Sequence, residues 1–180
     1  MAALLQVPVL IVTSLNRILI PAGLVTAIVS YLRRKQDIGG WFLYFYFWIG
    51  AVLLIYLTDA LGNYRVFLPS SKLDPTHQFA LIIAVYPRLL ALLGVVGIAV
   101  AIVKWREWVW IERVRLMLGV TAVIAAISVA LDAKYFPRSL FANLIRCTML
   151  WVWFIYFHVS KRVHHVFRTK DWDKFSARQA

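Results

Sequence analysis

Five stretches of apolar residues, separated by charged or turn-forming residues, divide the chain. They fall at about 18–32, where apolar residues continue upstream, and at 41–61, 79–103, 109–131 and 139–159. A helix needs roughly 20 predominantly apolar residues to cross the hydrocarbon core of a bilayer. The pattern therefore predicts an all-α fold, a polytopic transmembrane bundle of about five spanning helices, of which the first is an N-terminal hydrophobic segment.

Three regions follow from this pattern. Residues 1–36 are predicted to form an N-terminal helical segment, residues 37–160 a four-helix transmembrane domain, and residues 161–180 a basic cytoplasmic tail. The first region has two interpretations. Either residues 3–15 lie along the membrane interface and Pro21 marks a bend into the first spanning helix, or residues 3–32 form one tilted and kinked helix. A cleavable signal peptide is not expected, because the first side-chain cation, Arg17, comes late.

Composition agrees with a membrane protein. Only 16% of the residues are charged, against about a quarter in soluble domains. The net charge of +12 is expected from cations retained in cytoplasmic loops, and without a recognition module it does not predict nucleic-acid binding. Cys147 lies in an apolar run and is expected to pack there.

No catalytic site, metal site or cofactor is predicted. The chain has no serine-histidine-aspartate order, no metalloprotease motif and no phosphate-binding loop. His77 belongs to one side of the membrane, whereas His158, His164 and His165 lie at or beyond the other end of the last helix. These histidines therefore cannot face each other at one depth, as two axial ligands of a transmembrane haem would have to.

Cations in the short loops predict the orientation. One side carries the richer set of Lys and Arg and should be cytoplasmic, which gives an external N-terminus and a cytoplasmic C-terminus. Glu112, Arg113 and Arg115 lie at the inner end of the fourth stretch, and the spacing of Glu112 and Arg115 predicts a local ion pair. We expect contact with anionic lipid headgroups from the following side chains: Arg33, Arg34, Lys35, Lys104, Arg106, Lys161 and Arg162.

In the outer half of the predicted bundle, four charges fall within the apolar stretches or at their external ends: Asp59, Arg88, Asp132 and Arg146. Intramembrane charges usually face the bundle and pair with one another. One interpretation is thus a structural ion-pair network. A second is an outward-facing polar cavity in which Arg88 and Arg146 bind an anionic ligand or lipid headgroup, and a third is simple snorkelling of the side chains towards the interface. Pro87 frees the carbonyl of Ile83, which the Arg88 guanidinium could satisfy.

Two blocks of sequence resemble a known family. "DIGGWFLYFYFWIG" at 37–50 is similar to the opening of the bacterial integral membrane family called domain of unknown function 2569, and "YFHVSKRVHHVFRTK" at 156–170 is similar to its ending. The matching positions are Ile38, Gly39, Gly40, Trp41, Ser160, Lys161, Arg162, Val163 and Phe167. The resemblance covers about residues 37–170 and implies a four-helix fold in the bacterial inner membrane, without an assigned activity.

Three classes of function remain open on the sequence. The first is a non-catalytic accessory or structural subunit with protein partners in a larger membrane complex. The second is a small transporter or a sensor of a ligand or lipid, using the four intramembrane charges. The third is a membrane enzyme acting on lipid-linked substrates, for which no nucleophile is identified.

Overall fold

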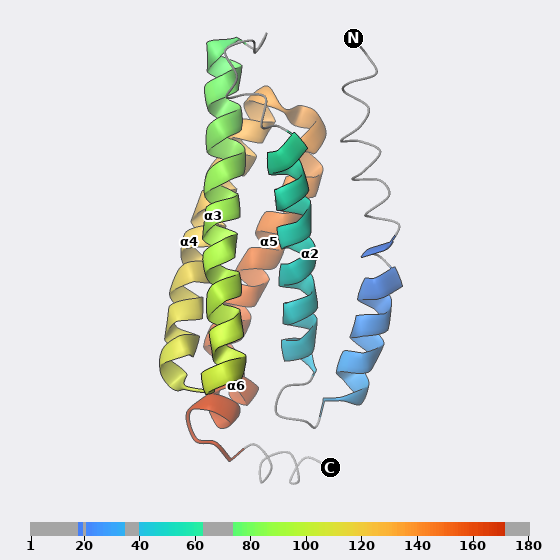
Figure 1. The fold of residues 1–180 in the computed structure, drawn as a ribbon, viewed down its shortest axis with the longest axis vertical. Helices are drawn as coiled ribbons and strands as arrows, with labels where there is room; N and C mark the ends of the chain where they lie inside the picture. The colour runs from blue at the N-terminus through green and yellow to red at the C-terminus, as the bar shows by residue number, and fades with distance from the viewer. Residues whose placement is uncertain (1–17, 20, 35–39, 63–73, 172–180) are drawn as a thin grey trace.

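The computed structural model describes residues 18–19, 21–34, 40–62 and 74–171. These residues fold into an antiparallel helical bundle (Figure 1). Its elements are an N-terminal helix at Pro21–Leu32, followed by α2 (Trp41–Gly62), α3 (Pro75–Trp105), α4 (Trp108–Tyr135), α5 (Pro137–Val159) and the short α6 (Lys161–Phe167). The four helices α2 to α5 are long and apolar enough to cross a membrane. The predicted all-α transmembrane bundle is therefore confirmed.

Local chemistry sets the helix ends. Asp74 caps α3, its carboxylate accepting a hydrogen bond from the backbone N–H of Thr76 at 3.1 Å, and Pro75 occupies the first turn. α3 thus begins four residues before the predicted apolar stretch and continues through Pro87 to Trp105. Arg106 then adopts a left-handed conformation with φ of 48°, which reverses the chain into α4.

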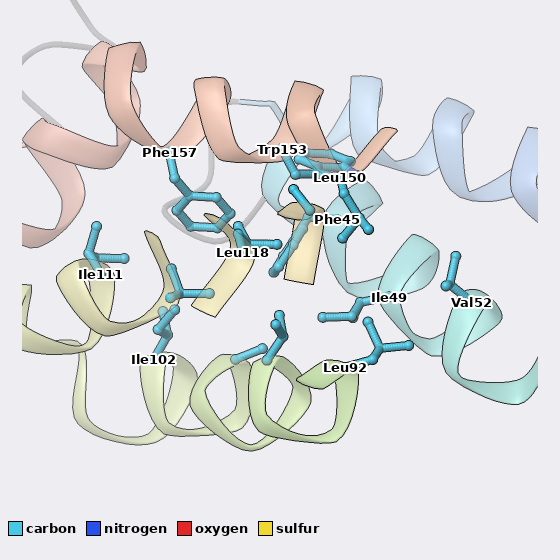
Figure 2. Packing of buried hydrophobic residues seen from close by; sticks show 14 of the residues in the cluster. Phe45, Ile49, Val52, Leu92, Ile102, Ile111, Leu118, Leu150, Trp153 and Phe157 are labelled. Atoms are coloured by element: carbon cyan, nitrogen blue, oxygen red, sulfur yellow. The ribbon is translucent and has the colours of Figure 1, made fainter. Parts of the chain in front are cut away.

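The core of the bundle is filled by large side chains from all four spanning helices. Phe45 of α2, Leu92 of α3, Leu118 of α4, and Leu150 and Trp153 of α5 are almost fully buried (Figure 2). Side chains on the opposite faces of these helices are also apolar but exposed, as expected for a surface in contact with lipid. Because lipid tails are themselves apolar, close van der Waals packing rather than the hydrophobic effect holds these helices together.

The predicted tail, 161–180, begins with a helix that packs under the bundle. Ser160 caps α6 by accepting a hydrogen bond from the backbone N–H of Val163 at 3.4 Å. Val163 and Phe167 of α6 are buried, and the Phe167 ring lies 5.4 Å from that of Phe42 at the start of α2. The first turns of the predicted tail therefore close one end of the core.

The N-terminal helix lies beside α2 (Figure 1). A side-chain carbon added at Gly23 would lie 3.3 Å from the ring of Phe47, so the two helices approach closely at this point. The described helix is shorter than a spanning helix. The two interpretations of the start concern residues 3–15, which lie outside the described residues.

Gly40 lies where the start of α2 meets α6. Its φ is +56°, a region that favours glycine, and an added Cβ would lie 2.6 Å from Nη1 of Arg162 in α6. The backbone of Arg34, at the end of the N-terminal helix, is 3.6 Å from the same position. Gly40 therefore allows the start of α2, α6 and the N-terminal helix to meet at one end of the bundle.

We expect Gly40→Ala to destabilise the protein by about 1–2 kcal/mol, because an alanine is strained in the left-handed region and must also displace the Arg162 guanidinium. Gly50→Ala is the matched control. Gly50 lies within α2 and an added Cβ meets nothing within 4 Å, so this change should stabilise the helix by about 0.5–1 kcal/mol. Unfolding in mixed detergent micelles measures both, and equal effects of the two changes would contradict the role of Gly40.

Candidate functional site

The four intramembrane charges predicted from the sequence lie in one continuous network. Nη1 of Arg146 is 3.7 Å from Oδ2 of Asp59 and donates a hydrogen bond to Oδ1 of Asn143 at 2.7 Å. Nδ2 of Asn143 donates to Oδ2 of Asp132 at 2.6 Å. The same Asp132 oxygen lies 3.9 Å from Nη1 of Arg88. We call these five residues, together with Tyr56, the polar network; it links α2, α3, α4 and α5.

Tyr56 provides a second connection between the two arginines. Its ring centroid is 5.2 Å from Cζ of Arg88 and 5.6 Å from Cζ of Arg146, within the range of a cation–π interaction. Sequence reasoning missed both Tyr56 and Asn143. A signal was available, since Tyr56 precedes Asp59 and Asn143 precedes Arg146 by three residues, which places each pair on one helix face.

Helix direction explains why the charges meet. The arginines lie on α3 and α5, which run in one direction, and the aspartates lie near the C-terminal ends of α2 and α4, which run in the other. Side chains on a helix lean towards its N-terminus. The guanidinium groups of Arg88 and Arg146 therefore reach towards the same end of the bundle, where Asp59 and Asp132 lie. Arg88 contacts Asp132 in this way, and no hydrogen bond from its guanidinium to the carbonyl of Ile83 is present among the described residues.

The two ion pairs of the network differ in burial. The Arg88 and Asp132 side chains are only 6% and 3% exposed, whereas those of Arg146 and Asp59 are 18% and 33% exposed. Two cations and two anions leave no net charge in the network. Within the described part of the chain, Nε of Arg88 is a buried donor without a hydrogen-bond partner, so the buried half of the network is less completely satisfied than the outer half.

The side chains predicted to contact lipid headgroups lie at the opposite end of the bundle from the polar network. Arg34 stacks on the ring of Tyr31 at 4.1 Å, and Lys104 lies 5.0 Å from the ring centroid of Trp105. Lys35 lies outside the described residues. The others are exposed or, in the case of Arg162, partly exposed beside Gly40: Arg33, Arg106, Lys161 and Arg162.

Glu112 and Arg115 make no close ion pair among the described residues, although the Glu112 charge still acts on Arg115. Glu112 accepts a hydrogen bond from Nε1 of Trp108 at 2.8 Å, and Nε of Arg115 donates to the carbonyl of Phe157 at 2.8 Å. Glu112 is thus bound by the indole of Trp108 in α4, and Arg115 is bound to a backbone carbonyl at the end of α5. This carbonyl comes from a helix that is distant in sequence, so the three-residue spacing gave no indication of it.

Two histidines contact aspartate carboxylates at the ends of the bundle. His77 lies 3.5 Å from Asp74, and this hydrogen bond lowers the pKa of the Asp74 carboxyl. His165 lies 2.8 Å from Asp171, whose pKa is lowered by hydrogen bonds with Thr169 and His165. In the described ranges no three His, Cys, Asp or Glu side chains are grouped to hold a metal ion.

Comparison with known proteins gives no relative. No family model, curated protein or solved structure matches the chain.

Proposed function

We propose that this multi-pass membrane protein is non-catalytic and serves as a small accessory or structural subunit of a larger complex in the bacterial inner membrane. The observation that carries the proposal is the neutral polar network, in which each charge of the bundle interior faces an opposite charge across helices. Such a network holds four helices in one arrangement, and intramembrane charges that pair in this way stabilise helix packing. A rigid bundle whose charges are satisfied internally suits a structural role.

The distribution of charge supports the orientation that belongs to this proposal. In the described residues, the end of the bundle formed by the α3–α4 turn and α6 carries ten cations and only three carboxylates, Glu107, Glu112 and Asp171. By the positive-inside rule this end faces the cytoplasm. The ten cations are Arg33, Arg34, Lys104, Arg106, Arg113, Arg115, Lys161, Arg162, Arg168 and Lys170.

One experiment tests both parts of the proposal. The chain is expressed at its native level in its own host with a C-terminal green fluorescent protein and is solubilised in a mild detergent. We expect the tag to fluoresce, because it folds in the cytoplasm, and the purified protein to carry stoichiometric partner chains. An unrelated inner-membrane protein with the same tag is the control for adventitious partners. A lone chain in mild detergent would count against the subunit role, and a dark tag on an expressed protein would count against the orientation.

A second candidate is a small transporter or sensor that binds an anionic ligand at Arg88 and Arg146. Two observations favour it: Nε of Arg88 is buried without a partner in the described part of the chain, and the pair of Arg146 and Asp59 is partly exposed. Intramembrane charges are frequent components of substrate pathways. In this case Arg88→Ala would abolish ligand binding and leave the yield of folded protein intact, whereas Arg88→Lys would keep the charge without the planar guanidinium.

A further inference from the structure

The turn between α3 and α4 carries two cations that stack on tryptophans. Nζ of Lys104 lies 5.0 Å from the ring centroid of Trp105, and Cζ of Arg113 lies 4.5 Å from that of Trp110. The two indole rings stack on each other, with centroids 4.9 Å apart and planes 17° from parallel. Within the described residues no carboxylate is within ion-pair distance of Lys104 or Arg113, in contrast to the arginines of the polar network.

The charged residues next to Arg113 on α4 already have partners within the chain. Glu112 accepts the hydrogen bond from Trp108, and Nε of Arg115 is bound to the carbonyl of Phe157. The carboxylate nearest in sequence to Arg113 therefore has another partner. The indole rings fix the positions of the Lys104 and Arg113 charges without using their N–H donors. Within the described residues no acceptor takes these donors, so they can bind an acceptor such as a phosphate.

Each of the two cations lies at the head of an apolar stripe that faces outward. On α4, positions three and four residues apart follow Arg113 along one face, and all of them are exposed: Leu116, Val120, Val123 and Ile127. On α3, the exposed side chains of Leu90, Leu93 and Val100 lead to Lys104 along one face, with Gly97 at the position between Leu93 and Val100. This arrangement matches the two parts of a lipid. The cation and the indole at the helix end lie at the level of the headgroup, and the apolar stripe lies along the acyl chain.

We propose that the α3–α4 turn is a binding site for anionic phospholipid. Lipid phosphates pair with the Arg113 guanidinium, which matches their geometry, and with the Lys104 ammonium. The acyl chains lie along the two apolar stripes, and the Trp105–Trp110 pair fills the headgroup layer. The excess of cations at this end selects a lipid with net negative charge over a zwitterionic one. The apolar stripes favour a lipid over a nucleic acid or an acidic peptide, because neither of these has an acyl chain that could lie along them.

Native mass spectrometry of the purified full-length chain tests this site. The protein is mixed with dioleoyl phosphatidylglycerol or dioleoyl phosphatidylcholine at equal concentration, and bound lipid is counted. The expected result is roughly tenfold stronger binding of phosphatidylglycerol, reduced to a difference of less than about twofold in the double variant Lys104→Gln/Arg113→Gln.

The control variant Arg168→Gln/Lys170→Gln removes the same charge from the same end of the bundle, including an arginine 5.6 Å from the ring of Trp108, and should keep the preference. The variant Lys104→Arg/Arg113→Lys alters the same two positions but keeps both charges, so it should keep the preference for phosphatidylglycerol. If it does, the loss in the Gln variant is due to the missing charges and not to a disturbed fold. Equal binding of the two lipids by the unaltered chain, or an equal loss in the control variant, would overturn the proposal. Competition by millimolar inorganic phosphate as strong as that by the lipid would also overturn it, since the site would then serve free phosphate. None of these readouts depends on whether the chain has protein partners.

Discussion

Arg88→Ala is expected to lower the free energy of unfolding by about 3–5 kcal/mol, because it leaves the Asp132 charge buried without its opposite charge. The Asp132 side chain is 3% exposed, and within the described residues it keeps only the hydrogen bond from Asn143. The measurement is reversible unfolding in mixed detergent micelles, followed by tryptophan fluorescence.

Two further variants make the result specific to the ion pair. Arg88→Met combined with Asp132→Asn removes both charges and keeps an acceptor for Asn143, so it should cost less than Arg88→Ala alone. Arg146→Ala breaks the more exposed pair with Asp59 and should cost only about 1 kcal/mol, because water screens a charge left near the surface. If Arg88→Ala unfolds no more easily than the unaltered chain, the network does not stabilise the fold, and the ligand-binding alternative gains.

Trp153→Ala is expected to destabilise the bundle by about 3–5 kcal/mol through the cavity that it leaves. Trp153 is 1% exposed and its ring is surrounded by other aromatic rings, with centroids at 5.1 Å for Phe45, 5.6 Å for Tyr156 and 6.0 Å for Trp48. The contacts with Phe45 and Trp48 join α5 to α2, and a smaller side chain loses them outright. Thermal denaturation, followed by size-exclusion chromatography of the remaining folded protein, measures the loss.

Trp151 is the matched control for Trp153. It lies two residues earlier on the same helix and is 40% exposed on the outer surface, so Trp151→Ala should cost less than about 1 kcal/mol. Trp153→Phe is informative as well. The indole N–H of Trp153 has no hydrogen-bond partner in the described part of the chain, so loss of this donor should offset part of the lost packing. A Trp151→Ala effect as large as that of Trp153→Ala would mean that the core is not where the structure places it.

Much of the fold could be predicted because its determinants are local. Apolar length alone located four spanning helices, and the charges that bound them marked the turns. The ends were less accurate. α3 begins at Pro75 rather than near 79 because the Asp74 side chain caps it, and such a cap can lie outside an apolar stretch. The first turns of the predicted tail proved to be α6, because Val163 and Phe167 find a place in the core.

The candidate site could be predicted only in part. Asp59, Arg88, Asp132 and Arg146 stood out because a charge is costly within an apolar stretch. Asn143 and Tyr56 carry no charge, so nothing comparable marked them, although Asn143 bridges the two ion pairs. The expected pair of Glu112 and Arg115 is not a close one for a different reason: a correct spacing on one helix does not exclude closer partners, here Trp108 and the carbonyl of Phe157.

By itself, the sequence determined that the chain is a bundle of membrane-spanning helices and which charges must avoid lipid, because both follow from the cost of placing each residue in hydrocarbon. Only the tertiary structure decided which charge meets which. The pairing of Arg88 with Asp132, and of Arg146 with Asp59, depends on the register of antiparallel helices. The meeting of Gly40 with Arg162 depends on how α6 folds back under the bundle. Those arrangements are fixed by the packing of large side chains such as Trp153 between helices, a property of the whole bundle that no single segment contains.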